Sequence, residues 1–313
     1  MSLIERAANR IAQDKEQAGA PACVVAQADQ PMPAGAAAPA AGAMPGVVPD
    51  IMPGALPGAA RHATTRSIEF DFVHLQELGL ITAGGGRTLL MEDFRIIKRP
   101  LIKRAFAPRT PGERPGNLIM ITSSLSGEGK TFCSVNLAMS IAMELDHTVL
   151  LVDADVARPS VMRTLGLPAQ RGLMDILLDD QVDMGDVMLR TNVNGLSLLP
   201  AGSANPRATE LLASQTMSTL VEEIAHRYPD RIVIFDSPPL LLTTEAHVLA
   251  AHMGQIVVVV EAEATTQHAL KDSLRQLEGL SDVNLLYNKT REFPGTASYD
   301  YQYNYDYGNS KHG

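Results

Sequence analysis

Residues 117–131 constrain the fold of this chain more than any other stretch, and they read NLIMITSSLSGEGKT. The apolar run 118–121 leads directly into a loop of small residues that ends in Gly129-Lys130-Thr131. The apolar segment FCSVNLAMSIAMEL follows with helical spacing. A strand, a small-residue loop and a helix in this order form the context in which a phosphate-binding loop occurs.

The residue types of this loop match the chemistry of a triphosphate. Glycines let backbone N–H groups turn toward phosphate oxygens, and the following helix points its positive end at them. Lys130 would reach the β- and γ-phosphates, and the Thr131 hydroxyl would ligate Mg²⁺. The usual pattern G-x-x-x-x-G-K-[ST] begins with glycine where this chain has Ser124, so the assignment needs support from elsewhere. The predicted nucleotide-binding residues of the loop are Ser126, Gly127, Glu128, Gly129, Lys130, Thr131 and Phe132.

Two further apolar runs end in carboxylates. Residues 149–155 read VLLVDAD, and residues 232–239 read IVIFDSPP. Short apolar runs of this kind are typical of strands buried on both faces of a parallel sheet. A single acid at such a strand end often only caps the following helix. Because ligands of open α/β sheets lie beyond the carboxyl ends of the strands, Asp153 and Asp236 together beside a phosphate loop favour metal–phosphate chemistry.

Apolar strand-like runs and helical segments continue to alternate up to about residue 288. This alternation predicts an α/β fold, a P-loop NTPase domain with a mostly parallel sheet flanked by helices. Further strands are predicted at 196–199, 232–235, 256–260 and 283–286, and helices at 88–104, 208–227 and 265–279.

Composition divides the chain into four parts. Residues 1–18 predict a short amphipathic helix, which is too short to be stable alone and is expected to dock on something. Residues 19–64 are rich in Ala, Pro and Gly and predict a disordered linker, because recurring prolines oppose a helix. Residues 65–290 hold the phosphate loop and the carboxylates and form the predicted catalytic domain. Residues 291–313 predict a flexible, tyrosine-rich tail.

Five of the seven tyrosines of the chain lie in this tail, where they alternate with Asp, Gln and Asn. Such alternation is found in edge strands, in aggregation-prone segments and in adhesive tails. In a chain with a nucleotide site, a terminal segment with acidic and small neighbours also fits a phosphoacceptor, which must be flexible to enter an active site. The candidate phosphoacceptors are Tyr299, Tyr301, Tyr303, Tyr305 and Tyr307.

Charge and cysteine content narrow the function classes. The formal net charge is −9, and no dense run of Lys and Arg offsets it, which argues against a nucleic-acid partner. The two cysteines form no C-x-x-C pair, so zinc sites, iron–sulfur sites and disulfide scaffolds are not expected. No apolar stretch approaches 18 residues, and the N-terminus lacks an apolar core, so neither a transmembrane helix nor a signal peptide is expected.

The segments SGEGKT, DADVARP and FDSPP, with the tyrosine cluster, together resemble a bacterial tyrosine kinase. More narrowly, they resemble the tyrosine autokinases of exopolysaccharide loci that accompany exosortase systems, over residues 66 to 307. The resemblance implies ATP and Mg²⁺ as cofactors and autophosphorylation of the tail in trans. The site residues that it implies are Lys130 on the phosphates, Asp153 assisting deprotonation of the tyrosine, Asp155 and Asp236 with Thr131 on Mg²⁺, and Asn288 on adenine.

The same resemblance implies partners. Glu92, Arg95 and Lys98 are similar to an E-x-x-R-x-x-R helix that joins subunits into a ring, although lysine lacks the bidentate fork of arginine. Charges at this spacing also occur on solvated helix faces. The implied partners are a separate membrane-anchored activator that sets polysaccharide chain length and a tyrosine phosphatase. The implied location is the inner face of the cytoplasmic membrane, where the kinase would regulate exopolysaccharide polymerisation and export.

Two other functions remain open at this point. One is a switch ATPase of the partition and cell-division type, which shares the sheet and the aspartates but carries a second lysine in the pattern K-G-G-x-G-K. This chain has Leu125 at the equivalent position, and its tyrosine tail is not expected in that class. The other is a nucleotide-binding scaffold that assembles without catalysis, which the intact lysine and aspartates disfavour.

Overall fold

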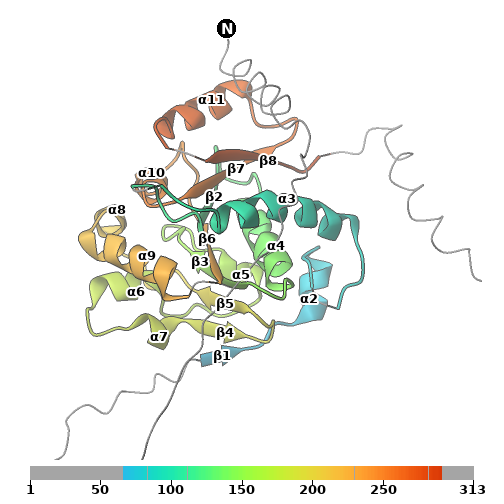
Figure 1. Ribbon diagram of the computed structural model, residues 1–313, viewed down its shortest axis with the longest axis horizontal. Helices are drawn as coiled ribbons and strands as arrows, with labels where there is room; N and C mark the ends of the chain where they lie inside the picture. Colours follow the sequence, from blue (N-terminus) through green and yellow to red (C-terminus); the bar gives the residue numbers. More distant parts are fainter. Residues whose placement is uncertain (1–65, 83, 111, 229, 281, 291–313) are drawn as a thin grey trace, which may run out of the picture. The chain divides into compact units, whose positions relative to one another are not determined.

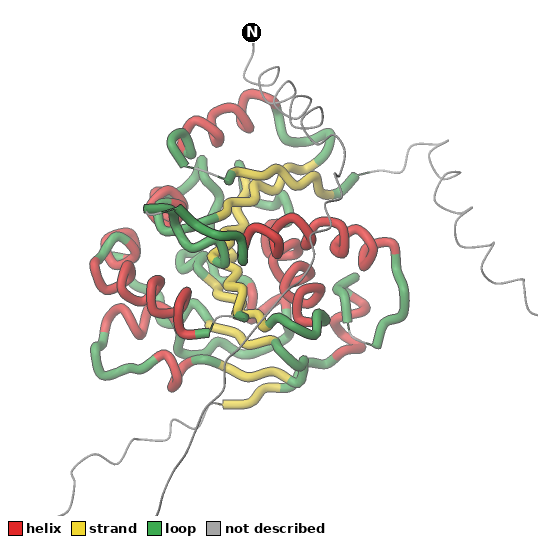
Figure 2. Tube along the Cα trace, in the orientation of Figure 1, coloured by secondary structure: helices red, strands yellow, loops and turns green. Residues whose placement is uncertain are grey.

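The computed structural model describes residues 66–82, 84–110, 112–228, 230–280 and 282–290. The predicted N-terminal helix, linker and tyrosine-rich tail lie outside these residues. Within them, eight strands form one sheet with helices against it (Figures 1 and 2). The predicted α/β class is confirmed.

The strand order in the sheet is β1-β4-β5-β3-β6-β2-β7-β8. From β5 to β8, all neighbouring strands are parallel. At the other edge, β4 pairs antiparallel with β5, and β1 pairs parallel with β4, so the sheet is mostly but not entirely parallel. The strands are β1 (Arg66–Ile68), β2 (Leu118–Ser123), β3 (Thr148–Asp153), β4 (Leu189–Thr191), β5 (Leu196–Leu199), β6 (Arg231–Asp236), β7 (Gln255–Glu261) and β8 (Val283–Asn288).

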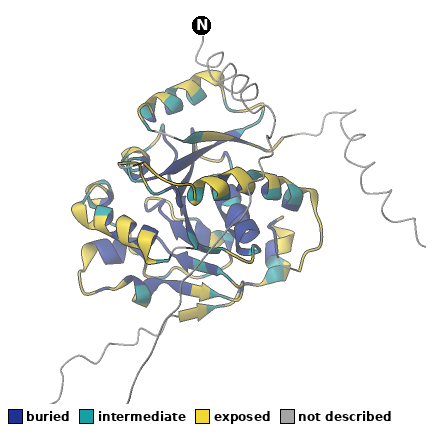
Figure 3. Ribbon diagram, viewed as in Figure 1, coloured by how far each residue is buried: buried dark blue, intermediate teal, exposed yellow. Residues whose placement is uncertain are grey.

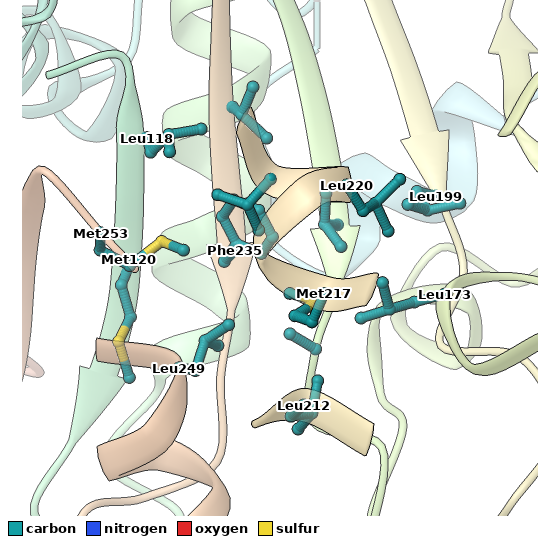
Figure 4. Packing of buried hydrophobic residues seen from close by; sticks show 14 of the residues in the cluster. Leu118, Met120, Leu173, Leu199, Leu212, Met217, Leu220, Phe235, Leu249 and Met253 are labelled. Atoms are coloured by element: carbon teal, nitrogen blue, oxygen red, sulfur yellow. The ribbon is translucent and has the colours of Figure 1, made fainter. Parts of the chain in front are cut away.

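Alternate side chains of the central strands enter two separate apolar clusters. In β2, Leu118 and Met120 join one cluster, whereas Ile119 and Ile121 join the other. This is the period of two expected for a strand, with both faces covered because the crossovers are helical. Figure 4 shows the first cluster, in which Phe235 of β6 lies close to residues of the covering helices.

Helices cover both faces of the sheet, as Figure 1 shows. Residues of four helices pack in the cluster that contains Ile119: α2 (Phe72–Glu77), α3 (Leu89–Ala105), α4 (Lys130–Ala142) and α5 (Val161–Thr164). The cluster that contains Leu118 takes residues from α6 (Leu173–Leu178), α7 (Met184–Val187), α8 (Ala208–Leu212), α9 (Gln215–Arg227), α10 (Thr244–Ala250) and α11 (Gln267–Gln276).

The predicted helix over 208–227 is wrong in one respect, because the structure divides it into α8 and α9. Ala213 ends α8, and the Ser214 hydroxyl accepts a hydrogen bond from Met217 N at 3.2 Å. A serine N-cap of this kind starts a new helix, because its side chain satisfies a backbone donor of the first turn. The short strands β1 and β4 were not predicted, since three residues carry too little periodicity.

Burial follows the layers, with the sheet interior buried and the outer faces of the helices exposed (Figure 3). In the part of the chain that the structure describes, no helix combines the length and apolarity needed to cross a membrane.

The predicted subunit-contact motif is wrong at its last position, Lys98. Glu92 and Arg95 form an ion pair at 2.5 Å on the outer part of α3. Lys98 instead lies in the interior, 3% exposed, where its Nζ donates to the Ser140 carbonyl at 2.5 Å and pairs with Glu144 at 2.7 Å. The Ser140 carbonyl belongs to the last turn of α4, which attracts a cation because its final carbonyls lack helical partners. Lys98 therefore fastens α3 to α4 and is not available to a neighbouring subunit.

Replacing Lys98 with Met should lower the free energy of unfolding by about 2 kcal/mol, because the α4 carbonyl and Glu144 lose a buried charged partner. Arg99→Met is the matched control, because Arg99 is adjacent in sequence but exposed, and it should change stability by less than about 0.5 kcal/mol. Urea denaturation followed by circular dichroism measures both. Equal midpoints for the two variants would contradict a stabilising role for the Lys98 contacts.

Candidate functional site

The predicted strand, loop and helix are β2, residues 124–129 and α4. Gly127 and Gly129 have φ angles of +92° and +95°, a region that favours glycine. A Cβ atom at Gly129 would also collide with the Asn288 amide. Gly129 is the N-cap of α4. Because no side chain caps this helix, the first N–H groups of α4 have no side-chain acceptor at the loop.

Ser124 occupies the position where the usual loop pattern has glycine, and the structure shows why serine is accepted. It is not among the residues with positive φ, so the backbone there places no demand for glycine. Its side chain is buried, and its Oγ has no hydrogen-bond partner. Leu125, where the switch ATPases carry their second lysine, is 39% exposed.

Three carboxylates gather beside Lys130 and Thr131. Asp153 and Asp236 end β3 and β6 and lie opposite each other in the parallel register, so both strands deliver their acids to one place. Asp155 follows two residues after the end of β3, and its Oδ2 pairs with Lys130 Nζ at 2.8 Å. The structure thus brings together all four residues predicted to be catalytic.

The Asp236 carboxylate is held from α4. Its Oδ2 accepts from Thr131 Oγ1 at 2.8 Å, and its Oδ1 accepts from Ser134 Oγ at 2.9 Å. The Thr131 hydroxyl also lies 2.7 Å from Ser160 Oγ. These contacts compensate a carboxylate that is completely buried.

Asp153 is compensated on one oxygen only. Its Oδ2 accepts the backbone N–H groups of Ser160 and Val161, each at 3.0 Å. Its Oδ1 is buried and has no partner. The carboxylate therefore caps the start of α5, as the simpler interpretation predicted, while its second oxygen is left without a hydrogen-bond partner.

Burial changes the acidity of both strand-end acids. Burial, together with the nearby Asp236 charge, raises the pKa of Asp153 to about 7. Burial also raises the pKa of Asp236 to about 6, although Lys130 and the hydrogen bonds from Thr131 and Ser134 oppose the rise. A carboxyl group with a pKa near neutrality exchanges protons readily at physiological pH.

The end of β8 holds the phosphate loop from the opposite side. Asn288 Nδ2 donates to the Glu128 carbonyl at 2.9 Å, and Lys289 Nζ donates to the neighbouring Gly127 carbonyl at 2.9 Å. Lys289 also pairs with Glu261 at 2.9 Å. With both carbonyls bound on this side, the N–H groups of residues 126–129 remain available for an anion.

Glu128 ties the loop to a third segment. Its carboxylate accepts from Leu125 N at 2.8 Å and from the Thr265 hydroxyl, which lies between β7 and α11. The predicted loop residue Phe132 is partly buried and packs against the apolar cluster that contains Ile119. The candidate phosphoacceptors Tyr299, Tyr301, Tyr303, Tyr305 and Tyr307 lie outside the described residues.

Sequence reasoning missed four residues of this network: Ser134, Ser160, Thr265 and Lys289. Ser134 lies one helical turn after Lys130, a spacing that could have identified it. Ser160 follows the DADVARP segment directly. Nothing in the sequence links Thr265 or Lys289 to the loop, because their contacts span more than 130 positions.

The donor set of the site fits magnesium bound with phosphate rather than a dedicated metal site. Among the described residues, no group of three or more His, Cys, Asp or Glu side chains is arranged to hold a metal ion. Mg²⁺ is usually held by one or two carboxylates together with phosphate oxygens and water.

A family model described as "AAA domain" matches residues 116–289, which contain the phosphate loop, all three aspartates and Asn288. Curated relatives of the same region are tyrosine-protein kinases. YwqD of Bacillus subtilis is 33% identical over 160 residues, 51% of this chain and 66% of that protein. CpsD of Streptococcus agalactiae is 28% identical over 198 residues, 63% of this chain and 82% of that protein. The chain belongs to this AAA-domain family, among the bacterial tyrosine kinases.

Solved tyrosine-kinase domains agree with this membership. The BceF tyrosine kinase domain has a TM-score of 0.57 at 25% identity, covering 71% of this chain and 91% of that domain. The VpsO kinase domain has a TM-score of 0.52 at 26% identity, covering 65% of this chain and 100% of that domain. The chain spans less than two thirds of the length of the first curated relatives, between 21% and 65%.

The raised pKa values of Asp153 and Asp236 predict a pH-dependent stability for this member of the bacterial tyrosine-kinase family. The ordinary pKa of both carboxyls is 3.8, so between about pH 4 and 7 the folded, nucleotide-free protein holds more protons than the unfolded chain. Its free energy of unfolding should therefore fall as the pH rises through this window. Asp153→Asn removes one of the two groups and should be more stable than the parent at pH 8, with the difference vanishing near pH 4. Thermal unfolding across this range measures it, and a variant less stable than the parent at pH 8 would reject the argument.

Proposed function

We propose that this protein is an ATP-dependent protein-tyrosine kinase that phosphorylates its own C-terminal tyrosine cluster. One observation carries the proposal: Lys130 and Thr131 of a phosphate loop share a buried site with three carboxylates, one of which keeps an unpartnered oxygen. Relatives of this region are named tyrosine-protein kinases, and the chain carries its own tyrosine-rich segment.

The phosphate loop fits the triphosphate of ATP. Its two glycines at positive φ allow the tight turn of the loop. The N–H groups at the uncapped start of α4, together with Lys130, supply positive potential for three charged phosphates. In this proposal, residues 126–132 bind the phosphates and Asn288, which lies against the loop, contacts the adenine.

Thr131, Asp155 and Asp236 are the residues that would hold Mg²⁺. The Thr131 hydroxyl already touches Asp236, and Asp155 is paired with Lys130, the residue that precedes Thr131. When bound, the metal ion neutralises charge that develops on the phosphate oxygens during transfer.

Asp153 is proposed to accept the proton of the incoming tyrosine at its unpartnered Oδ1. Two backbone N–H groups fix the opposite oxygen, so the carboxylate is oriented before the substrate arrives. The tyrosine oxygen then forms a bond to the γ-phosphorus while the bond between that phosphorus and the β–γ bridging oxygen breaks. Lys130 holds its charge close to the transferred group.

The proposed phosphoacceptors are Tyr299, Tyr301, Tyr303, Tyr305 and Tyr307 of a neighbouring copy. The wider role rests on the family resemblance. It comprises regulation of exopolysaccharide polymerisation and export at the inner face of the cytoplasmic membrane, with a membrane-anchored activator and a tyrosine phosphatase as partners. For contact between copies, Glu92 and Arg95 remain the proposed residues, without Lys98.

Lys130→Met should abolish phosphotyrosine formation, because the variant lacks the charge that follows the transferred phosphoryl group. Purified protein is incubated with Mg²⁺-ATP, with an activator fragment if required, and mass spectrometry maps the label to residues 299–307. Lys271→Met is the control for loss of an exposed lysine and should retain parental activity. Label on serine, or equal label in the Lys130 variant, would reject the kinase assignment.

Substitutions at Asp153 and at Asp236 should have different effects on transfer and on nucleotide binding. Asp153→Asn should reduce transfer by about 100-fold or more with little change in nucleotide affinity, because its proposed role is on the acceptor hydroxyl. Asp236→Asn should also weaken nucleotide binding that depends on Mg²⁺. Equilibrium binding of a fluorescent ATP analogue, with and without Mg²⁺, is compared with single-turnover transfer. If both variants bind and react like the parent, these carboxylates serve only as structural caps.

A further inference from the structure

The positive charge of this acidic chain is concentrated in one segment. Seven of its 26 Lys and Arg residues lie between positions 95 and 114, together with one acidic residue, Glu113. The sequence shows no dense basic run there, because at most two of the seven are adjacent. The segment covers the second half of α3 and the loop that leads to β2.

The fold collects most of these charges on one surface. We define the basic surface by five residues that are all exposed: Arg99, Lys103, Arg104, Arg109 and Arg114. Four of them line a single cavity of about 520 Å³, and Arg99 precedes it on α3. Two acids, Glu113 and Asp282, also line this cavity, and Asp282 pairs with Arg104. Positive charge therefore exceeds negative charge at this surface.

The cavity lies at the opposite end of the sheet from the nucleotide loop. Gly116, Gln255 and Asp282 line it, and they stand at the amino ends of β2, β7 and β8. The phosphate loop begins at the carboxyl end of β2, and Asn288 is the last residue of β8. Because these three strands are parallel, a partner on the basic surface would leave the nucleotide loop open.

Apolar side chains are exposed beside the charges. Ile96 is 73% exposed and lies on the same helical face as Arg99 and Lys103, three and seven positions further along α3. Phe106, which follows the helix, is 39% exposed, and its ring stacks on the His147 ring with 4.7 Å between the ring centroids. Figure 3 shows the outward side of α3 as largely exposed. An exposed apolar side chain of α3 thus lies beside basic side chains, which attract anionic lipid headgroups.

We propose that the basic surface docks directly on anionic lipid headgroups of a membrane. Screening limits the reach of surface charges to about 10 Å, so the local excess of positive charge outweighs the net charge of the chain. The exposed Ile96 favours a lipid surface over a nucleic acid or an acidic protein tail, since a lipid surface offers apolar material beneath its charges. The docking needs no catalytic residue, so it does not depend on phosphoryl transfer.

Vesicle flotation of the full chain tests this inference. The parent should bind vesicles that contain phosphatidylglycerol, should not bind vesicles of phosphatidylcholine alone, and should dissociate as the salt concentration rises. The triple variant Lys103→Gln, Arg109→Gln, Arg114→Gln keeps the Arg104 pair intact and should bind roughly 100-fold more weakly, at about fivefold per basic residue.

Arg171→Gln, Arg207→Gln, Lys271→Gln is the matched control, since it removes the same number of exposed positive charges elsewhere and should bind like the parent. All variants keep residues 1–65, so any contribution of that segment is equal. Lys130→Met should bind vesicles like the parent, which separates this proposal from the kinase assignment. Equal binding by the triple variant and the parent, binding to neutral vesicles, or a stronger preference for polyglutamate or RNA would each overturn the proposal.

Discussion

The burial of Asp153 and Asp236 side by side is the constraint on which the rest of the site depends. Two carboxylates on adjacent strands, both withdrawn from water, are costly unless donors or cations compensate them. The compensation comes from α4 through Thr131 and Ser134 and from the start of α5 through two backbone N–H groups. It remains incomplete at Asp153 Oδ1, which is buried without a hydrogen-bond partner.

The sheet makes this placement possible. Because β3 and β6 run parallel and in register, their final residues must meet, whatever the loops beyond them do. The side-chain alternation that separates the two apolar clusters also fixes which strand residues face which helices. The site is therefore positioned by the most buried part of the molecule, and its precision comes from the rigidity of that core.

The sequence predicted the motif-bearing elements well because their signals are local. Strand 196–199 coincides with β5, and α3 is displaced by one residue from the predicted 88–104. The long-range contacts could not be predicted. Lys98 reads as a surface charge until α4 is packed against it, and the contact of Lys289 with the loop joins residues 162 positions apart. The basic residues of α3 and of the loop before β2 are dispersed in the sequence. Most of them form one surface only in the folded protein, where four line a cavity at the amino ends of β2, β7 and β8.

The contact of Lys289 with the loop places the end of the described chain close to the nucleotide loop. Residue 290 marks a fixed point beside the nucleotide loop, and Tyr299 follows nine positions later. A fully extended chain spans at most about 3.5 Å per residue, so Tyr299 can move no farther than roughly 30 Å from that point, whereas Tyr307 can reach about twice as far. The maximal distance from this point therefore increases with position from Tyr299 to Tyr307. The spacing between copies in an assembly would decide how many of them come within reach of a neighbour.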